Sequence, residues 1–468
     1  MSLSTDSFSQ MHAIFNAQKE AFENAPHPSL QTRLAQLNDL KSVIQTHQSK
    51  LIDAIQADFG ARAPTETKLA ELFPLTHQIE YIQKNLSAWM QSSQRALPIQ
   101  LRPARAMVVY QPLGVVGVLS PWNYPILLSL SPLATAIAAG NRVMLKPSEW
   151  TPETSGMIRT MLAQAFDESL IAVILGEQTT ANAFSKLPFD HLLFTGSTEV
   201  GKKVMKNAAD HLTPVTLELG GKSPVIITTS SNLHTAAKRI AFGKCFNGGQ
   251  TCIAPDYALI PEHLLDEFAR EFTTVVKKMY KKSSDFTPIA HPHHLNRIEQ
   301  LLEDAEKKGA RVVYAQERSE AMRLPPTLVF NPRENCRIMQ EEIFGPILCL
   351  LSYSGDIKEA VSYINSRPRP LALYLFSNRE DDIEYVTKHT HSGGLCVNDT
   401  LVHFAVDDLP FGGIGASGMG QYHAKEGFLT FSKAKSVFLR KKFSTTDLFL
   451  PPWNRLIHKL FFSFFLKR

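Results

Sequence analysis

The sequence predicts an α/β protein built from two doubly wound, Rossmann-like domains. A chain of 468 residues is too long for a single hydrophobic core, so two or three domains are expected. Its 44% hydrophobic and 20% charged residues are typical of an ordinary soluble globular protein. From residue 106 onward, apolar strand-like runs alternate with helical patterns, which indicates βαβ units and parallel sheets.

The N-terminal part begins with helices and then changes to the alternating pattern. Residues 8–58 and 65–95 predict helices, the second ending near Trp89. The Val-rich run at 106–120 predicts a buried strand. Further strands and helices are expected to alternate, at 142–147, 152–165, 170–176, 178–186, 191–196 and from about Val200.

A second alternation begins at residues 214–221, so a domain boundary is predicted near 210–215. The segment 408–420 holds five glycines in thirteen positions, too many for a helix or a regular sheet. The strands and helices expected between these segments lie at 223–229, 232–246, 256–260, 262–280, 293–308, 357–366 and 380–389.

Charge and cysteine content limit the class of protein. The formal net charge of +5 is spread over both signs, unlike the clustered Lys and Arg of a dedicated nucleic-acid binder. Five cysteines without a CxxC pair predict free thiols in a reducing compartment, and we expect a cytoplasmic protein. The N-terminus has no secretory signal pattern, and no apolar run reaches the ~18 residues of a membrane-spanning helix. The histidines 291, 293 and 294 read as a loop entering a helix, and no metal is expected.

Cys252 is the candidate nucleophile. It follows a glycine-rich turn in the run FNGGQTCIAP, a kind of backbone that leaves a thiol accessible. The other four cysteines read as small buried hydrophobes: Cys245, Cys336, Cys349 and Cys396. A free thiol has a pKa of about 8.5, so an enzyme has to lower it or remove the proton on demand.

Glu218 is the candidate base. It ends an apolar run and precedes Gly220 and Gly221, which let backbone pass close to a ligand. An enzyme that forms a thioester on a cysteine and then hydrolyses it needs both a nucleophile and a base. That Glu218 meets Cys252 in space is a prediction, and the alternative for Glu218 alone is a solvated or salt-bridged side chain.

Polar residues follow two other apolar runs. Asn123, after Pro121 and Trp122, offers an amide that could donate to an oxyanion, and the alternative is a turn asparagine. Lys146 and Glu149 lie where doubly wound sheets bind ligands, and both can hydrogen-bond ribose hydroxyls. The alternative for this pair is a loop ion pair.

Two further segments are weak signals when taken alone. Between a strand and a helix, Gly196 and Gly201 are separated by four residues, which is not a GxGxxG pattern. The helix start would nevertheless offer its N–H groups to a pyrophosphate. Glu342 and Phe344 in MQEEIFGPIL are informative only in combination with the other candidate segments.

Taken together, these segments resemble the NAD(P)-dependent aldehyde dehydrogenases. The matching runs occur in order over about residues 10–440: SPWNYP, KPSE, FTGSTEVG, LELGGKSP, GQTC, EEIFGP and DLPFGGIGASGMG. GQTCIAPDY, NDTLVHFAV and SGMGQYHAKEGFLTFS resemble the class 3 branch, and ADFGARAPTETKLAELFP resembles the bacterial coniferyl aldehyde dehydrogenase group. One departure is Ala424, where class 3 relatives usually carry glycine.

The resemblance implies a role for each candidate. Cys252 would attack the aldehyde, Asn123 and the Cys252 N–H would hold the oxyanion, and Glu218 would activate the hydrolytic water. Residues of the cofactor site would be Lys146 and Glu149 at the adenosine ribose, Gly196 and Ser197 at the pyrophosphate, Glu342 at the nicotinamide ribose, and also Trp122, Gly201, Leu219 and Phe344. NAD is the expected cofactor, with NADP also accepted.

The resemblance also implies the aldehyde dehydrogenase fold, a domain order and a homodimer. We expect a cofactor-binding domain at 1–212, a catalytic domain at 213–400 and an oligomerisation segment at 401–442. A β-hairpin near 98–112 is expected to join the small β oligomerisation element. The favoured substrate is coniferyl or another aromatic aldehyde. The alternatives are a medium- or long-chain fatty aldehyde dehydrogenase, an acylating enzyme that uses coenzyme A, and a non-catalytic binding protein of the same fold.

Residues 443–468 predict an amphipathic C-terminal tail. After Pro451 and Pro452, one apolar face is formed by Trp453, Leu456, Ile457, Leu460, Phe461 and Phe464, and the basic side chains of Arg455, His458, Lys459 and Lys467 lie largely off it. This helix is expected either to rest on an anionic membrane surface or to cap the partner subunit near the substrate entrance.

Overall fold

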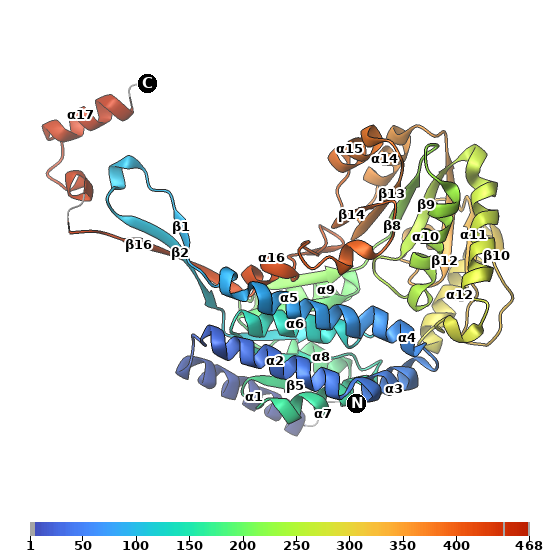
Figure 1. Cartoon of the computed structure of the whole chain (residues 1–468), viewed down its shortest axis with the longest axis horizontal. Coiled ribbons are helices and arrows are strands. Elements are labelled where there is room, and N and C mark those ends of the chain that lie inside the picture. The colour runs from blue at the N-terminus through green and yellow to red at the C-terminus, as the bar shows by residue number, and fades with distance from the viewer. Residues whose placement is uncertain (1–4, 443–444, 467–468) are drawn as a thin grey trace.

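The structure is a computed structural model that describes residues 5–442 and 445–466. It contains two α/β units and an arm that projects from them (Figure 1). The two large sheets have six and seven strands, and all neighbours are parallel except one edge strand in each. The predicted fold class, two doubly wound, Rossmann-like α/β units with a small β element, is therefore confirmed.

The first sheet has the strand order β15-β7-β6-β3-β4-β5. Its helices occupy the predicted places; the helix expected at 152–165, for example, spans Pro152–Ala165. The strands are β3 (Val115–Leu119), β4 (Arg142–Lys146), β5 (Ile171–Val173), β6 (His191–Gly196), β7 (Val215–Leu219) and β15 (Gly418–Met419), and the helices are α6 (Leu127–Ala138), α7 (Pro152–Ala165), α8 (Gln178–Phe184) and α9 (Thr198–Ala209).

The strands of this sheet are apolar throughout because helices cover both faces. In β3, Val116 and Val118 belong to the core shared with α6 and α7, whereas Val115 and Leu119 belong to a separate core with α8 and α9. Alternate residues of a strand point to opposite faces, so one five-residue strand contributes to two cores.

The predicted N-terminal helices are present and pack on the first sheet. They are α1 (Thr5–Asn24), α2 (Leu30–Thr46), α3 (Gln48–Phe59), α4 (Pro64–Thr67), a π-helical turn (Lys68–Leu72) and α5 (Phe73–Trp89). The single strand expected at 106–120 is wrong, because the run breaks at Gly114 into two strands of different sheets. Gly114 has φ 145°, and a Cβ there would lie 2.0 Å from a carboxylate oxygen of Asp190.

The second sheet has the order β10-β11-β12-β9-β8-β13-β14. Its strands are β8 (Ser223–Ile227), β9 (Pro255–Pro261), β10 (Arg311–Tyr314), β11 (Thr327–Phe330), β12 (Ile347–Tyr353), β13 (Ala372–Phe376) and β14 (Gly394–Val397), and its helices are α10 (Leu233–Cys245), α11 (Leu265–Met279), α12 (Pro292–Lys307), α13 (Arg337–Gln340), α14 (Ile357–Asn365) and α15 (Glu380–His389).

The expected boundary between residues 212 and 213 needs correction. Strand β7 pairs in parallel with β6, from Leu192 opposite Val215 to Gly196 opposite Leu219. It is thus part of the first sheet, and the second sheet begins at Ser223. An apolar run does not reveal which sheet it joins, because that choice depends on hydrogen bonds to strands distant in sequence.

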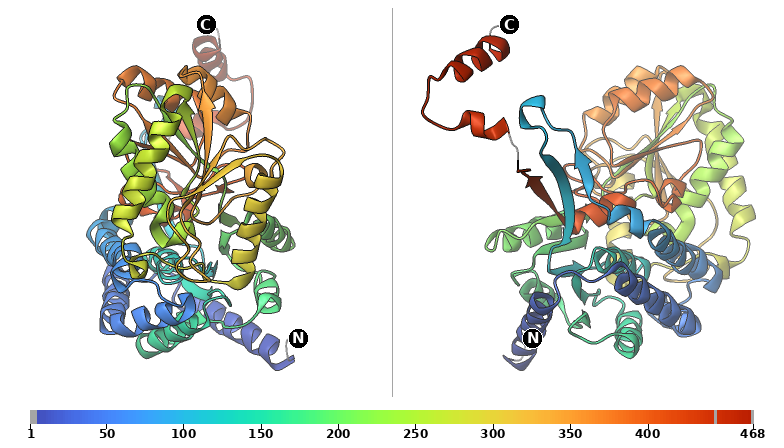
Figure 2. Two further views of the ribbon diagram at one scale, coloured as in Figure 1. Left: turned by 90° about the vertical axis from the view of Figure 1, so that its right-hand side faces the viewer. Right: turned by 60° about the vertical axis from the view of Figure 1, so that its left-hand side comes forward.

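The arm is a three-stranded antiparallel sheet, with β1 (Ser93–Arg95), β2 (Arg105–Pro112) and β16 (Ser432–Leu439). Figure 2 shows the hairpin β1–β2 and the strand β16 extending away from both large sheets. The expected hairpin is present, and it begins earlier than predicted, at Ser93. The short helix α16 (Ala424–Thr430) leads into β16, and Ala424 has φ 54°, in the left-handed region that favours glycine.

The predicted tail helix is present as α17 (Leu456–Phe465). Its apolar side is exposed, with 72% of Leu456 and 75% of Phe464 accessible. His458, expected off the apolar face, is instead buried and packs against Trp453. Lys467 lies outside the described residues. No helix in the described part of the chain is long and apolar enough to cross a bilayer.

Candidate active site

The carboxyl ends of four adjacent strands bring the predicted residues to one edge of the first sheet. Leu119 of β3 lies opposite both Lys146 of β4 and Phe194 of β6. Thr195 of β6 in turn lies opposite Glu218 of β7. Ligands of doubly wound sheets bind at this edge, so the register explains how residues distant in sequence come together.

The Cys252 loop is held in a compact left-handed turn. Asn247, Gly248 and Gly249 all have positive φ, and a Cβ on Gly249 would lie 2.3 Å from the carbonyl oxygen of Gly345. Gln250 donates to the carbonyl oxygens of Asn247 and Pro288, at 2.8 and 3.1 Å. The turn leaves Cys252 half-buried, whereas the other four cysteines are buried, as predicted.

Glu218 is a buried carboxyl group without a hydrogen bond. It is 3% exposed, and neither of its oxygens has a partner among the described residues. Burial raises its pKa well above the ordinary value. A carboxylate that no protein group satisfies is available to accept a proton from a water molecule.

Cys252 lies within the electrostatic reach of two carboxylates. Its pKa is raised to about 12, first by burial and then by the charges of Glu342 and Glu218. Glu218 and Cys252 therefore lie within electrostatic range of each other, although Glu218 belongs to the first sheet and the Cys252 loop precedes β9 of the second. At neutral pH this thiol holds its proton, so its activation requires a base or the relief of this repulsion.

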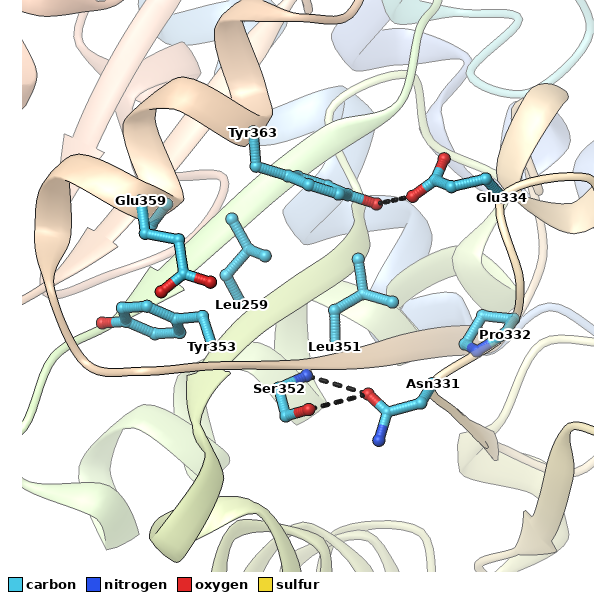
Figure 3. A pocket seen from close by; sticks show the side chains of 10 residues that line it. Leu259, Asn331, Pro332, Glu334, Leu351, Ser352, Tyr353, Glu359 and Tyr363 are labelled. Carbon is cyan, nitrogen blue, oxygen red and sulfur yellow. Dashed lines mark hydrogen bonds between the residues drawn. The ribbon is translucent and has the colours of Figure 1, made fainter.

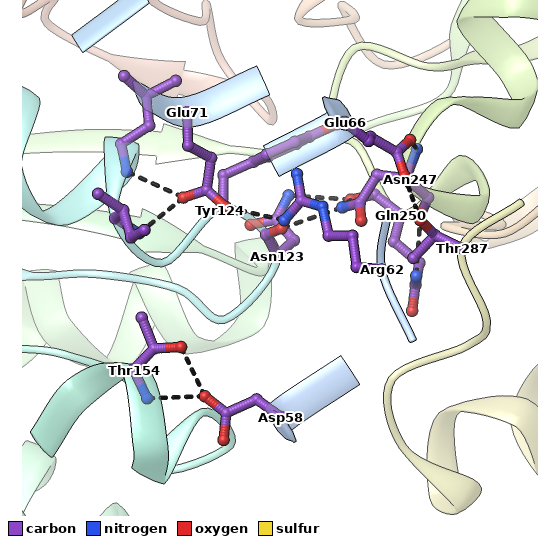
Figure 4. Close-up of polar contacts among 12 residues, drawn as sticks. Asp58, Arg62, Glu66, Glu71, Asn123, Tyr124, Thr154, Asn247, Gln250 and Thr287 are labelled. Atoms are coloured by element: carbon purple, nitrogen blue, oxygen red, sulfur yellow. Dashed lines mark hydrogen bonds and ion pairs between the residues drawn. The ribbon is translucent and has the colours of Figure 1, made fainter. Parts of the chain in front are cut away.

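Asn123 is bonded to the segment that carries the cysteine. Its Nδ2 donates to the carbonyl oxygen of Gln250 at 3.1 Å (Figure 4). In return, Nδ2 of Asn247 donates to the carbonyl oxygen of Asn123 at 3.0 Å. These reciprocal bonds hold the Asn123 amide beside the Cys252 loop, where an oxyanion donor would be needed.

Lys146 and Glu149 form an ion pair of 2.6 Å at the end of β4. The loop ion pair weighed as an alternative is thus present. The pair can still hydrogen-bond a ribose, because the Lys146 ammonium has further N–H donors and the Glu149 side chain is 23% exposed. This donor and acceptor set fits the adenosine ribose of a dinucleotide.

The start of α9 has the form expected of an anion site. Ser197 caps this helix, and its Oγ accepts a hydrogen bond from the Val200 N–H at 3.4 Å. Gly201 packs against Leu219, since a Cβ there would lie 2.7 Å from its Cδ2. Packing accounts for this glycine; direct contact of Gly201 or Leu219 with a cofactor stays a prediction.

Glu342 and Phe344 lie on a loop that polar contacts hold in place. Lys222 donates to Asp256 and to the carbonyl oxygens of Ile338 and Glu341, and Asp256 accepts the Ile343 N–H at 2.9 Å. A Cβ on Gly220 would lie 2.1 Å from Glu342 Oε2, so a larger residue there would displace this carboxylate. Burial and then the charge of Asp256 raise the pKa of Glu342 to about 8.

Trp122 contacts both α/β units at the edge of the first sheet where the predicted residues lie. Its ring contacts Phe344, His291 and His294 with centroids 5.3–5.5 Å apart. Trp122 follows β3, and the other three residues belong to the second unit. The histidines lie at the start of α12, as predicted, and no described group of three or more possible ligands is arranged to hold a metal ion.

A separate cavity of about 190 Å³ contains none of the predicted site residues (Figure 3). It is lined by Leu259, Leu351 and Tyr363, among others, and its wall includes the bond from the Ser352 N–H to Asn331, 2.9 Å long. Leu259 lies toward the end of β9, whereas Cys252 precedes the start of that strand. This cavity therefore lies apart from the cysteine loop.

The paired Rossmann-like units and the cysteine loop define a nucleotide-dependent oxidoreductase. A sequence model described as "Aldehyde dehydrogenase family" matches residues 2–437. The chain belongs to the aldehyde dehydrogenase family, which confirms the resemblance, and it is an NAD(P)-dependent enzyme that oxidises aldehydes.

Three relatives illustrate the range of the match. A protein of Pseudomonas aeruginosa named "Probable coniferyl aldehyde dehydrogenase" is 49% identical over 99% of this chain and 98% of its own length. The mouse "Aldehyde dehydrogenase family 3 member A2" is 40% identical over 93% and 90%. The solved "Substrate bound state of Staphylococcus Aureus AldH" has a TM-score of 0.92 at 37% identity, over 97% of this chain and 99% of that one.

Proposed function

We propose that this enzyme oxidises coniferyl aldehyde or a similar aromatic aldehyde to the carboxylic acid, with Cys252 as nucleophile and Glu218 as base. One observation carries the assignment of residues: a buried carboxylate with no hydrogen-bond partner among the described residues lies within electrostatic range of a half-buried cysteine whose loop is bonded to Asn123. The substrate class follows the printed name of the 49% identical relative.

The thiolate of Cys252 attacks the carbonyl carbon, a C–S bond forms, and the carbonyl electron pair moves to oxygen. The amide of Asn123 and the N–H of Cys252 stabilise this oxyanion. NAD, when bound, supplies the acceptor for the hydride that the carbon loses. The acyl group then remains on Cys252 as a thioester.

Glu218 completes the cycle. It accepts a proton from a water molecule whose oxygen attacks the thioester carbon, the C–S bond breaks, and the thiolate and the acid are released. Acylating enzymes of this fold commonly lack a glutamate at this position, so Glu218 favours hydrolysis over transfer to coenzyme A.

We further propose that NAD is preferred to NADP. Glu149 can accept hydrogen bonds from both free ribose hydroxyls of NAD, whereas its carboxylate repels a 2′-phosphate. Lys146, which is bonded to Glu149 at 2.6 Å, attracts that phosphate, so we expect a lower level of activity with NADP.

An aldehyde panel tests this function. Coniferyl aldehyde and benzaldehyde are expected to exceed acetaldehyde in kcat/KM by about tenfold or more, because a larger apolar group is removed from water. The measurement is absorbance of the reduced cofactor, with NAD and then NADP, and with and without coenzyme A.

Other outcomes of this panel point to the alternatives. Higher kcat/KM for hexanal or octanal would identify a fatty aldehyde enzyme, and a coenzyme A thioester product would identify an acylating one. Absence of reduced cofactor with every aldehyde would indicate a binding protein. A tenfold preference for NADP would contradict the role given to Glu149.

We also propose a cytoplasmic homodimer that assembles through the arm. Strand β16 pairs with β2 on one side only within the described chain, and an unpaired strand edge is a template for another strand. The exposed apolar side of α17 fits either the partner subunit or an anionic membrane surface. All five cysteines are free, which supports a reducing compartment.

Sedimentation of the full chain and of a chain ending at Leu450 tests the arm and the tail. Both are expected to sediment as dimers, because the truncation leaves β16 intact. A monomeric full chain would contradict the dimer. Equal co-sedimentation of the two with anionic vesicles would exclude membrane binding by the tail, and an unchanged KM for long aldehydes after truncation would exclude capping of the entrance.

A further inference from the structure

Arg62 and Glu71 form a completely buried ion pair beside the segment that carries Asn123. Their side chains are both 0% exposed, and Arg62 Nη1 donates to Glu71 Oε1 at 2.7 Å. Replacing such a pair by apolar residues of similar volume is often neutral or stabilising. Stability alone is therefore a weak reason for two charges at this place.

Glu71 holds the segment that carries Asn123. Its second oxygen, Oε2, accepts the N–H groups of Ile126 and Leu127 at 2.7 and 3.0 Å (Figure 4). These groups open helix α6, whose first N–H groups have no partner within the helix. One carboxylate thus fixes the backbone three residues after Asn123.

Arg62 contributes to the same segment through Tyr124. Its guanidinium carbon lies 5.1 Å from the centre of the Tyr124 ring, within the range of a cation–π contact. The Tyr124 hydroxyl is 2.5 Å from the Thr251 hydroxyl, and Thr251 immediately precedes Cys252. The ion pair therefore reaches the cysteine loop through one aromatic side chain.

Glu66, on the same N-terminal segment, binds the cysteine loop directly. Its Oε1 accepts the Asn247 N–H at 2.6 Å, and Oε2 accepts the Thr287 hydroxyl. Asn247 is the residue whose amide donates to the carbonyl oxygen of Asn123. We call Arg62, Glu66 and Glu71 the brace, because together they contact the segment that carries Asn123 and the loop that carries Cys252.

We propose that the brace is a positioning device that sets the Asn123 amide against the Cys252 sulfur. The inference rests on the proposed roles of Asn123 and Cys252. A misplacement of about 1 Å in such a constellation can lower the rate about 100-fold. The brace acts on geometry through Tyr124 and the start of α6, and it does not touch the substrate.

The test uses a neutral double variant, so that no buried charge is left alone. Arg62→Met/Glu71→Met is expected to lower kcat about 10- to 100-fold, with the dissociation constant for NAD unchanged. Alkylation of Cys252 by iodoacetamide should change in rate as well. Arg62→Met/Glu71→Gln restores an acceptor for Ile126 and Leu127 and should recover most of the loss.

Arg33→Met is the matched control. Arg33 is also a buried arginine, and it donates to the carbonyl oxygen of Ala138 at 3.0 Å, at the opposite end of the same helix α6. We expect a lower melting temperature and an unchanged kcat. The brace is refuted if Arg62→Met/Glu71→Met keeps kcat within about twofold of the parent.

Tyr124→Phe provides a second test of the proposal if the double variant does not fold. It removes only the hydroxyl contact with Thr251, and it is expected to lower kcat several-fold. Tyr353→Phe is its control, because the buried Tyr353 hydroxyl donates to the Ile227 carbonyl oxygen at 2.8 Å in the second unit. Equal kcat values for the two variants would contradict the proposal that the brace acts on the Cys252 loop through Tyr124. Activity of Cys252→Ala, measured in parallel, would show instead that the proposed nucleophile is wrong.

Discussion

Replacement of Cys252 by alanine is expected to abolish aldehyde oxidation and to leave NAD binding intact. No C–S bond can form without the sulfur, so both the thiohemiacetal and the thioester are lost. We expect a fall in kcat of about 10⁴-fold or more. The residues proposed for the cofactor lie on other elements, among them Lys146 and Glu149 at the end of β4.

The measurement pairs steady-state turnover with calorimetric titration of NAD. Cys349→Ala is the matched control, because Cys349 is buried in β12, and this substitution should change stability more than kcat. Appreciable turnover by Cys252→Ala would contradict the covalent route. Loss of NAD binding together with turnover would show that the loop supports the cofactor site as well.

The order of strands and helices could be predicted because it follows from the local periodicity of apolar residues. The helix α7 begins at Pro152 and ends at Ala165, where the sequence pattern begins and ends. The sheet to which β7 belongs could not be predicted in this way. Its pairing with β6 depends on contacts between Val215 and Leu192, and both neighbouring sheets offer apolar strands.

The candidate site, too, could be predicted only in part. Cys252 and Glu218 could be identified from glycine-rich surroundings, but that they lie within electrostatic range of each other depends on how the two units pack. Arg62 and Glu71 were not predicted, because charged residues in a helical stretch are usually solvated. Asn247 and Gln250 stand within the quoted run FNGGQTCIAP, and the glycines between them are the signal that could have marked a structured turn.

Glu218→Gln is expected to stop the cycle after the thioester has formed. Glutamine has nearly the shape of glutamate but cannot accept a proton from water, so hydrolysis should slow by about 10²- to 10⁴-fold. Formation of the thioester does not need this water. A pre-steady-state burst of reduced cofactor should therefore survive while steady-state turnover collapses.

The pH dependence gives a second signature. Burial raises the pKa of Glu218, so the fraction in the basic form increases as pH rises through that raised value. Turnover limited by hydrolysis should increase with pH in the parent enzyme, and this increase should vanish in Glu218→Gln. Glu199→Gln is the control, because Glu199 is an exposed residue of α9 whose pKa is lowered by Lys202.

The burst also decides which proton Glu218 accepts. The pKa of the Cys252 thiol is raised to about 12, so the thiol itself requires a base or the removal of nearby negative charge. If the burst disappears in Glu218→Gln together with turnover, Glu218 takes the thiol proton as well as that of water. If the burst keeps its amplitude and rate, Glu218 acts on water alone, and the thiol is activated by a different route. Stopped-flow absorbance of the reduced cofactor, with one coniferyl aldehyde concentration above KM, distinguishes the two.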